Sequence, residues 1–216
     1  MKSRGLQGTT LIEVARKLGR ETARRKSQNP KRQDSRLPAL WLVTDPGRTP
    51  DPAGAVAALP KGAGVIYRAF GRADAVATGR RLATICRRRG LVLLVGADER
   101  LAADVGAAGL HLPQRMLAQG PRIRARRPDW ILTGAAHDRA ALAVAARAGL
   151  DAALLSPVFP SRSPSAGRPL GPLRFAILAR GAKLPVYALG GVNARTAKRL
   201  EMSGAAGLAA VEALAR

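Results

Sequence analysis

From Leu40 onward, short apolar runs alternate along the chain with longer stretches in which Ala, Leu and Arg recur at helical spacing. The apolar runs predict eight strands, at Leu40–Val43, Val65–Arg68, Leu91–Val95, Gly109–Leu112, Trp130–Thr133, Ala152–Leu155, Pro185–Ala188 and Gly207–Val211. The stretches between them include helix candidates at Ala73–Arg89, Arg139–Ala148, Leu173–Arg180 and Ala194–Met202.

Alternating strands and helices indicate a parallel sheet, because parallel neighbours need a crossover connection. Strands that are apolar throughout are typical of a sheet covered on both faces. Eight such units predict a closed (β/α)₈ TIM barrel, an α/β fold that fits a single domain of this length. The alternative is an open doubly wound sheet. Its Gly-x-Gly-x-x-Gly signature is missing after the first strand, where the chain reads Thr44-Asp45-Pro46-Gly47.

The first 37 residues differ from this pattern. Leu11, Ile12, Val14, Ala15 and Leu18 form a short amphipathic stretch, and a polar run follows from Arg24 to Arg36. We expect residues 1–37 to be a basic N-terminal extension, flexible or partly helical, and residues 38–216 to form the barrel. The alternative is a surface-docking or targeting helix, since the segment is basic and poor in acids, like a transit peptide.

Composition narrows the choice of partners. Apolar residues make up 47% of the chain and no run approaches a membrane span, so we expect a folded domain without a membrane partner. The single cysteine, Cys86, excludes an internal disulfide and favours the cytoplasm. The net charge of +23 attracts phosphates and other anions, although genome composition also produces such a bias. Aromatic residues are only 3%, which argues against specific nucleic-acid binding. The sequence leaves open whether the chain forms a homo-oligomer.

Candidate chemistry lies just past the strands, because barrel enzymes carry their active sites at the carboxyl ends of the strands. Gly190 and Gly191 follow the seventh strand and precede a helix, a position where free N–H groups favour an anion. The alternative is that the two glycines only permit a tight turn. Ser161 and Ser163 stand in the long loop 156–171, which could close over an anionic ligand or form a passive, proline-stiffened connection.

The two histidines differ in position. His137 follows the fifth strand at the rim, where an imidazole suits proton transfer, but it could equally cap the following helix. His111 lies inside the fourth strand, and we expect it to be a hydrogen-bonded histidine of the barrel core.

Several motifs, in order and at matching spacing, resemble the thiamine phosphate synthase/TenI family over Leu40–Arg216. They are Leu42-Val43-Thr44-Asp45, Val105–Leu112 followed by Gln114, Ser156-Pro157-Val158-Phe159-Pro160, Leu189-Gly190-Gly191-Val192, and Gly204-Ala205-Ala206-Gly207. The resemblance implies a TIM barrel and one of two reactions. One branch joins a pyrimidine pyrophosphate to a thiazole phosphate with magnesium. The other isomerises a thiazole carboxylate phosphate by proton transfer without a metal.

Comparison with that family also shows departures at its metal site. The resemblance places the Asn-Asp pair of the family on Gly96-Ala97, although Asp98 follows one place later and an indel could restore it. It places a second metal carboxylate on Ala108. Magnesium prefers carboxylate oxygens, which alanine does not supply. We therefore expect no cofactor and weak or absent coupling chemistry.

The other family positions are mixed. Arg68 matches a family arginine of the substrate site, whereas Phe70 replaces its lysine. A phosphate-binding serine falls on Glu212, whose charge would repel phosphate. His137 matches the proton-transfer histidine of the tautomerase branch.

The sequence thus predicts a protein of thiamine biosynthesis that binds a small phosphorylated, thiazole phosphate-type substrate. Tautomerase chemistry fits better than coupling, with His137 as acid/base and Arg68, Ser161, Ser163, Gly190 and Gly191 as ligand contacts. The alternative is a non-catalytic barrel that binds a polyanionic or protein partner through its basic surface.

Overall fold

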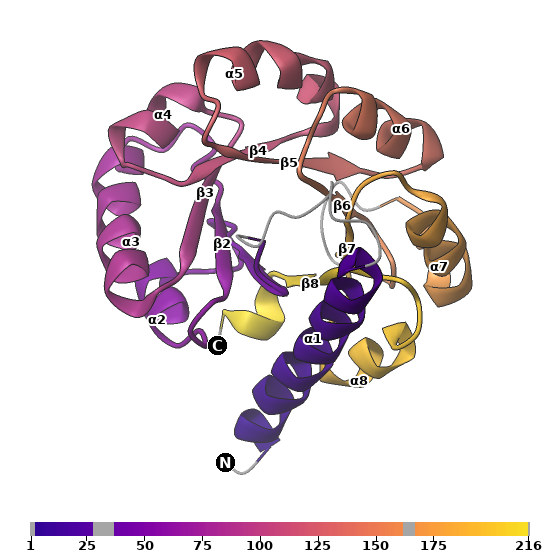
Figure 1. The fold of residues 1–216 in the computed structure, drawn as a ribbon. Coiled ribbons are helices and arrows are strands. Elements are labelled where there is room, and N and C mark those ends of the chain that lie inside the picture. Colours follow the sequence, from indigo (N-terminus) through magenta and orange to yellow (C-terminus); the bar gives the residue numbers. More distant parts are fainter. Residues whose placement is uncertain (1–2, 28–36, 162–166, 216) are drawn as a thin grey trace.

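The computed structural model describes residues 3–27, 37–161 and 167–215, with side chains in the first range described only for residues 10–22. Eight parallel strands follow one another around a closed barrel, in sequence order (Figure 1). The strands are β1 (Leu40–Val43), β2 (Gly64–Tyr67), β3 (Val92–Gly96), β4 (Gly109–Leu112), β5 (Ile131–Ala136), β6 (Ala152–Leu155), β7 (Val186–Ala188) and β8 (Gly207–Ala210). β8 pairs with β1, with Leu208 opposite Leu40, so the predicted TIM barrel is confirmed and the open sheet is wrong.

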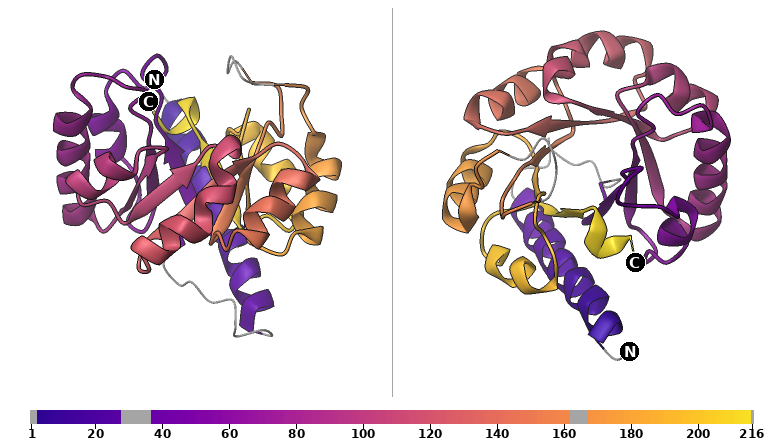
Figure 2. Two further views of the ribbon diagram at one scale, coloured as in Figure 1. Left: turned by 90° about the horizontal axis from the view of Figure 1, so that it is seen from above. Right: turned by 180° about the vertical axis from the view of Figure 1, so that it is seen from behind.

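Helices surround the strands on the outside (Figures 1 and 2). They are α1 (Ser3–Ser27), α2 (Pro52–Ala57), α3 (Ala75–Arg89), α4 (Glu99–Asp104), α5 (Gly120–Arg126), α6 (Arg139–Arg147), α7 (Gly171–Gly181) and α8 (Ala194–Ala197), with 3₁₀ turns η2 (Gln114–Gln119), η3 (Lys198–Leu200) and η4 (Glu212–Leu214). Among the helices described, none is both long and apolar enough to cross a membrane.

Large side chains fill the inside of the barrel. Trp41 and Tyr187 are fully buried there and meet edge to face, with ring centroids 6.3 Å apart. Gly64 leaves room for the indole, because a Cβ at that position would come within 2.2 Å of the Trp41 ring. Such a packed interior closes the barrel below its rim and leaves room for a ligand only at the rim.

A second apolar layer lies between the strands and the helices. Leu82 and Cys86 of α3 pack there against the strands, and both are buried. Burial raises the pKa of the Cys86 thiol to about 11. The thiol therefore stays protonated and unreactive near neutral pH.

The helix α1 covers the outside of the barrel where it closes. It packs on β8, β1 and α8, and Figure 1 shows it crossing β8 beside α8. Leu11, Val14, Ala15 and Leu18 are buried in the core, and the Lys17 ammonium donates to the Glu201 carboxylate. The apolar face of this helix is covered by the barrel. The division at residue 37 stays a prediction.

Leu18→Ala is expected to lower the free energy of unfolding by about 2–5 kcal/mol, because it removes a fully buried side chain between α1 and the barrel. Urea unfolding measures the change. Arg16→Ala, on the exposed side of the same helix, is the matched control and should change stability by less than about 0.5 kcal/mol. Equal stability of the two variants would show that α1 is not part of the cooperative fold.

Candidate functional site

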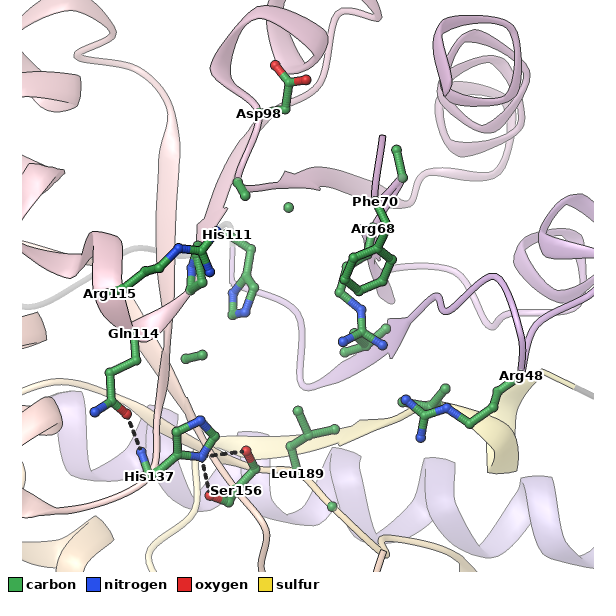
Figure 3. A pocket seen from close by; sticks show the side chains of 18 of the residues that line it. Arg48, Arg68, Phe70, Asp98, His111, Gln114, Arg115, His137, Ser156 and Leu189 are labelled. Atoms are coloured by element: carbon green, nitrogen blue, oxygen red, sulfur yellow. Dashed lines mark hydrogen bonds between the residues drawn. The ribbon is translucent and has the colours of Figure 1, made fainter. Parts of the chain in front are cut away.

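A cavity of about 800 Å³ opens at the rim formed by the carboxyl ends of the strands (Figure 3). Its lining includes Arg68 after β2, His111 in β4, His137 after β5, Ser156 after β6 and Gly190 after β7. These residues are far apart in the sequence and meet because parallel strands all end on the same rim. The cavity is therefore the candidate ligand site.

His137 stands at the edge of this cavity with a defined ring orientation. Its Nδ1 lies 2.7 Å from the carbonyl oxygen of Ser156, and its backbone N–H donates to Oε1 of Gln114 at 3.1 Å. A carbonyl oxygen only accepts hydrogen bonds, so Nδ1 carries the ring proton. In the neutral form of the ring this leaves Nε2 as the acceptor, and Figure 3 shows Nε2 facing the open space. The ring is thus prepared to accept a proton from a ligand.

The alternative interpretation of His137 as a helix cap is wrong. The following residue, Asp138, is the cap of α6, and its Oδ1 accepts from the backbone N–H of Ala141 at 2.7 Å. Asp138 thus caps the start of α6 without the imidazole, and His137 lines the cavity.

His111 is the core histidine that its place inside β4 predicts. Its ring is buried, and Nδ1 lies 2.9 Å from the Thr133 hydroxyl. Burial, with a smaller contribution from the positive charge of Arg68, lowers the pKa of His111 to about 3. The ring is therefore neutral near pH 7 and forms part of the wall of the cavity.

Arg68 belongs to a small ionic network at the β1–β2 side of the rim. Its Nε donates to the Thr44 carbonyl at 2.8 Å and its Nη2 to Oδ2 of Asp45 at 3.0 Å. Arg48 donates to the same Oδ2 at 3.0 Å. The hydrogen bond from Arg48, helped by the charges of Arg48 and Arg68, holds the pKa of Asp45 below its ordinary value. Both arginines line the cavity, whereas Asp45 is not among its lining residues.

Phe70 flanks this network. The Arg68 guanidinium carbon lies 5.1 Å from the centroid of the Phe70 ring, within the range of a cation–π contact. Phe70 is 68% exposed, and its φ of 49° is unfavourable for a bulky residue. Phe70 also lines the cavity.

The Gly190–Gly191 turn packs tightly against the loop after β6. A Cβ at Gly190 would meet Pro157 at 2.7 Å, and one at Gly191 would meet the Pro160 oxygen at 2.4 Å. Both residues also have positive φ, so the turn requires glycine on packing grounds alone. Within the described residues, the N–H groups of Gly190 and Gly191 have no hydrogen-bond acceptor. They stay available to a ligand, and of the two residues Gly190 lines the cavity.

The structure bears differently on the other residues that were expected to contact a ligand. Ser161 lines the cavity, whereas Ser163 lies outside the described residues. Glu212 begins η4 and does not line the cavity. The N-terminus of α8 offers less than expected, because the Asn193 side chain already accepts from the N–H groups of Arg195 and Thr196.

The acidic residues that line the cavity among the described residues are Asp98 and Glu99. Over the described parts of the chain, no group of three or more His, Cys, Asp or Glu residues comes together. Oδ1 of Asp98 caps α4 by accepting from Leu101, and Glu99 is paired with Arg126. A divalent cation that needs several carboxylate oxygens therefore finds no matching set among these residues.

Ala108 requires a correction. Ala108 directly precedes β4, and its N–H donates to the Leu93 carbonyl. The residue is exposed at the amino end of the barrel. A carboxylate at this position would stand at the wrong end for a ligand at the rim. The expectation that a metal ligand belongs at 108 is wrong, and the rim after β4 carries Gln114 and Arg115 instead.

Sequence reasoning missed the second arginine of the ionic network and the role of Gln114. Arg48 follows β1 in the loop that begins with Thr44-Asp45, and the family motif noted there ends at Asp45. An Asp-x-x-Arg spacing within a tight turn is the available signal. Gln114 was noted as a family match, but the sequence gave no sign that it holds the backbone of His137.

Comparisons with known proteins agree with this architecture. The family model described as thiamine monophosphate synthase matches residues 40–214. The thiamine-phosphate synthase of Geobacillus kaustophilus is 33% identical over 146 residues, which are 66% of this chain and 65% of that protein. The bifunctional protein ThiM/ThiE of Symbiobacterium thermophilum is 38% identical over 136 residues, 62% of this chain and 28% of that protein. The chain thus spans less than two thirds of the length of these relatives.

A solved structure shows the same fold. The thiamine phosphate pyrophosphorylase from Pyrococcus furiosus superimposes with a TM-score of 0.73 at 21% identity, covering 84% of this chain and 89% of that chain. At this identity the likeness concerns the barrel and not the reaction.

The buried His111 is expected to make stability depend on pH. Its folded pKa of about 3 lies below the ordinary value, so the unfolded chain binds a proton that the folded chain does not. This contribution is complete above pH ~6.5 and is lost as the pH falls toward 3, at up to about 1.4 kcal/mol per pH unit. Urea unfolding at pH 7, 6 and 5 should show a smaller loss for His111→Gln than for the unmodified chain. Parallel pH curves would contradict a neutral buried ring.

Proposed function

The chain belongs to the thiamine monophosphate synthase/TenI family, and on this premise we propose that it binds a thiazole phosphate-type ligand in the rim cavity and isomerises it by metal-free proton transfer. The observation that carries the proposal is the fixed tautomer of His137: Nδ1 is committed to the Ser156 carbonyl at 2.7 Å, and Nε2 faces the cavity.

His137 acts in this proposal as the group that takes a proton from the ligand and returns it at another atom. Isomerisation needs both steps, and a single imidazole performs both because its charged form is the acid that its neutral form produced. The Ser156 carbonyl stabilises the imidazolium by keeping its hydrogen bond from Nδ1. The fixed ring orientation spares the site a reorganisation during the reaction.

The remaining cavity residues orient the ligand. Arg68 supplies positive charge on the side away from His137, while the Gly190 and Gly191 N–H groups and the Ser161 hydroxyl are proposed to hold the phosphate. Ser163 keeps the same proposed role, although it lies outside the described residues. Buried apolar neighbours such as Val43 exclude water from the bottom of the cavity.

The basic surface supports the alternative role as a binding module. Arg80, Arg81, Arg87, Arg88 and Arg89 are exposed on α3, a helix without an acidic residue, and within the described residues none of the five has an ion-pair partner. A polyanion that bound this face would do so in a salt-dependent manner and without involving the cavity. We favour the enzymatic role because His137 and its partners are arranged for a reaction that a surface-binding module does not need.

His137→Asn is expected to lower the tautomerase rate by about 10²–10⁴-fold, because it removes the acid/base group. The rate is measured as interconversion of the two thiazole carboxylate phosphate tautomers by NMR. Melting temperature and affinity for thiazole phosphate should stay close to those of the unmodified chain. A His137→Gly variant is the chemical control: added imidazole should restore part of its activity. Full activity in His137→Asn would contradict the proposed role.

Magnesium-dependent coupling of a pyrimidine pyrophosphate to thiazole phosphate is expected to be absent or very weak, because the described cavity residues offer no carboxylate set for the cation. The assay follows thiamine phosphate formation with magnesium and with a chelator. Robust product formation that the chelator abolishes would show that the chain is a synthase.

A further inference from the structure

We infer that Arg115 binds the carboxylate of the ligand beside His137, and that the cavity thereby selects a ring that carries a carboxylate. The inference rests on the proposed function, because that function supplies a ligand with two anionic groups, a phosphate and a carboxylate. The phosphate has its proposed place at the Gly190–Gly191 turn. The carboxylate needs a separate partner, and Arg115 is the residue whose position and charge fit it.

Arg115 lies on the same side of the cavity as His137. It follows Gln114 in η2, after β4, and it lines the cavity. Oε1 of Gln114 accepts from the backbone N–H of His137 at 3.1 Å, so the residue next to Arg115 is tied to the acid/base residue. Figure 3 shows Arg115 and His137 on one side of the cavity, across from Arg68. A group bound to Arg115 is therefore held on the side where the proton transfer is proposed to occur.

The charge of Arg115 distinguishes it from the other arginines of the lining. Arg48 and Arg68 both donate to Asp45, which partly neutralises them. Arg115 has no ion-pair partner within the described residues, and its side-chain N–H groups have no acceptor there. Charge at the wall of a concave site is screened less than charge on a convex surface, because the low-dielectric walls concentrate its field. Arg115 therefore attracts an anion into the cavity.

The acidic residues of the lining do not supply that anion. Oε1 of Glu99 accepts from Nε of Arg126 at 3.1 Å. Oδ1 of Asp98 accepts from the backbone N–H of Leu101 at 2.8 Å and caps α4. Both carboxylates are thus engaged with groups other than Arg115, and the partner that remains is a ligand.

The donors of Arg115 suit a carboxylate. A guanidinium has five N–H groups in a planar fork, and a carboxylate accepts two parallel hydrogen bonds from one such fork. The phosphate of the same ligand has other proposed donors, the N–H groups of Gly190 and Gly191 and the Ser161 hydroxyl. With the two anionic groups at separate places in the cavity, the ring between them is fixed in one orientation.

A carboxylate held at Arg115 also assists the proton transfer. When Nε2 of His137 takes a proton from a ring carbon, the electron pair stays on the ligand and spreads over the ring and the carboxylate joined to it. Hydrogen bonds from Arg115 to the carboxylate oxygens strengthen as this charge grows. The imidazolium then returns the proton to another carbon, and the extra charge disappears. The step needs no oxidant, reductant or metal.

The test compares two ligands that differ in the carboxylate alone, thiazole phosphate and thiazole carboxylate phosphate. Calorimetric titration of the full chain at constant ionic strength measures both affinities. The unmodified chain should bind the carboxylate form more tightly. Arg115→Gln should reduce this preference by about tenfold or more, as expected for lost hydrogen bonds between charged groups. Using the ratio of the two affinities removes the loss of attraction that both phosphates share.

Two further variants separate direct contact from general attraction. Arg122→Gln is the matched control, because Arg122 is exposed on α5 and does not line the cavity; its preference should stay within about twofold of the unmodified chain. Arg115→Lys keeps the charge but loses the fork, so it should retain only part of the preference. The melting temperature of each variant confirms folding.

Three outcomes would overturn the carboxylate site. They are an unchanged preference in Arg115→Gln, an equal loss in Arg122→Gln, and an unmodified chain that does not prefer the carboxylate form. The rate gives a second readout: Arg115→Gln should also lower kcat for tautomerisation, because its contact strengthens as charge develops. An unchanged kcat with a raised KM would refute the contribution to proton transfer.

The outcomes also separate the carboxylate site from the proposed function. Full tautomerase activity in His137→Asn together with a lost preference in Arg115→Gln would refute the proton-transfer role and support the carboxylate site. Loss of activity in His137→Asn with an unchanged preference in Arg115→Gln would do the reverse.

Discussion

Closure of the barrel through the pairing of β8 with β1 is the constraint on which the site depends. The register that sets Leu208 opposite Leu40 makes the sheet continuous, and all eight strands then end on one rim. Closure is feasible because large side chains fill the interior of the barrel, and the Trp41 ring packs directly against Gly64. A filled interior moves ligand binding to the rim, where loops from every part of the chain converge.

At that rim, the side chains of His137 and Arg68 are each held by the loop that follows a neighbouring strand. The ring of His137, after β5, is oriented by Ser156, after β6. The guanidinium of Arg68, after β2, is oriented by Thr44 and Asp45, after β1. Such supports between adjacent loops fix orientation before a ligand arrives, which lowers the entropy that binding costs. The strand order therefore defines the site as much as the residue types do.

The fold was predictable from periodicity because the predicted strands are mostly apolar and recur between stretches of helical spacing. The prediction failed where elements are short or where an end had to be assigned. α4 has only six residues, too few to show a helical period. Ala108 stands close to β4 in the sequence, yet it lies at the amino end of the barrel, because four residues of strand separate it from the rim. The apolar face of α1 was recognised, but the surface that covers it was not.

The sequence by itself determined the number and order of the strands, the rim on which chemistry must lie, and His137 and Arg68 as its candidates. These follow from local patterns, since hydrophobic periodicity and turn residues act over a few positions. Only the tertiary structure decided that α1 packs across the closing strands, that Ser156 holds Nδ1 of His137, and that Arg48 shares Asp45 with Arg68. Those facts depend on hydrogen bonds and contacts between loops and helices that come together only when the barrel closes.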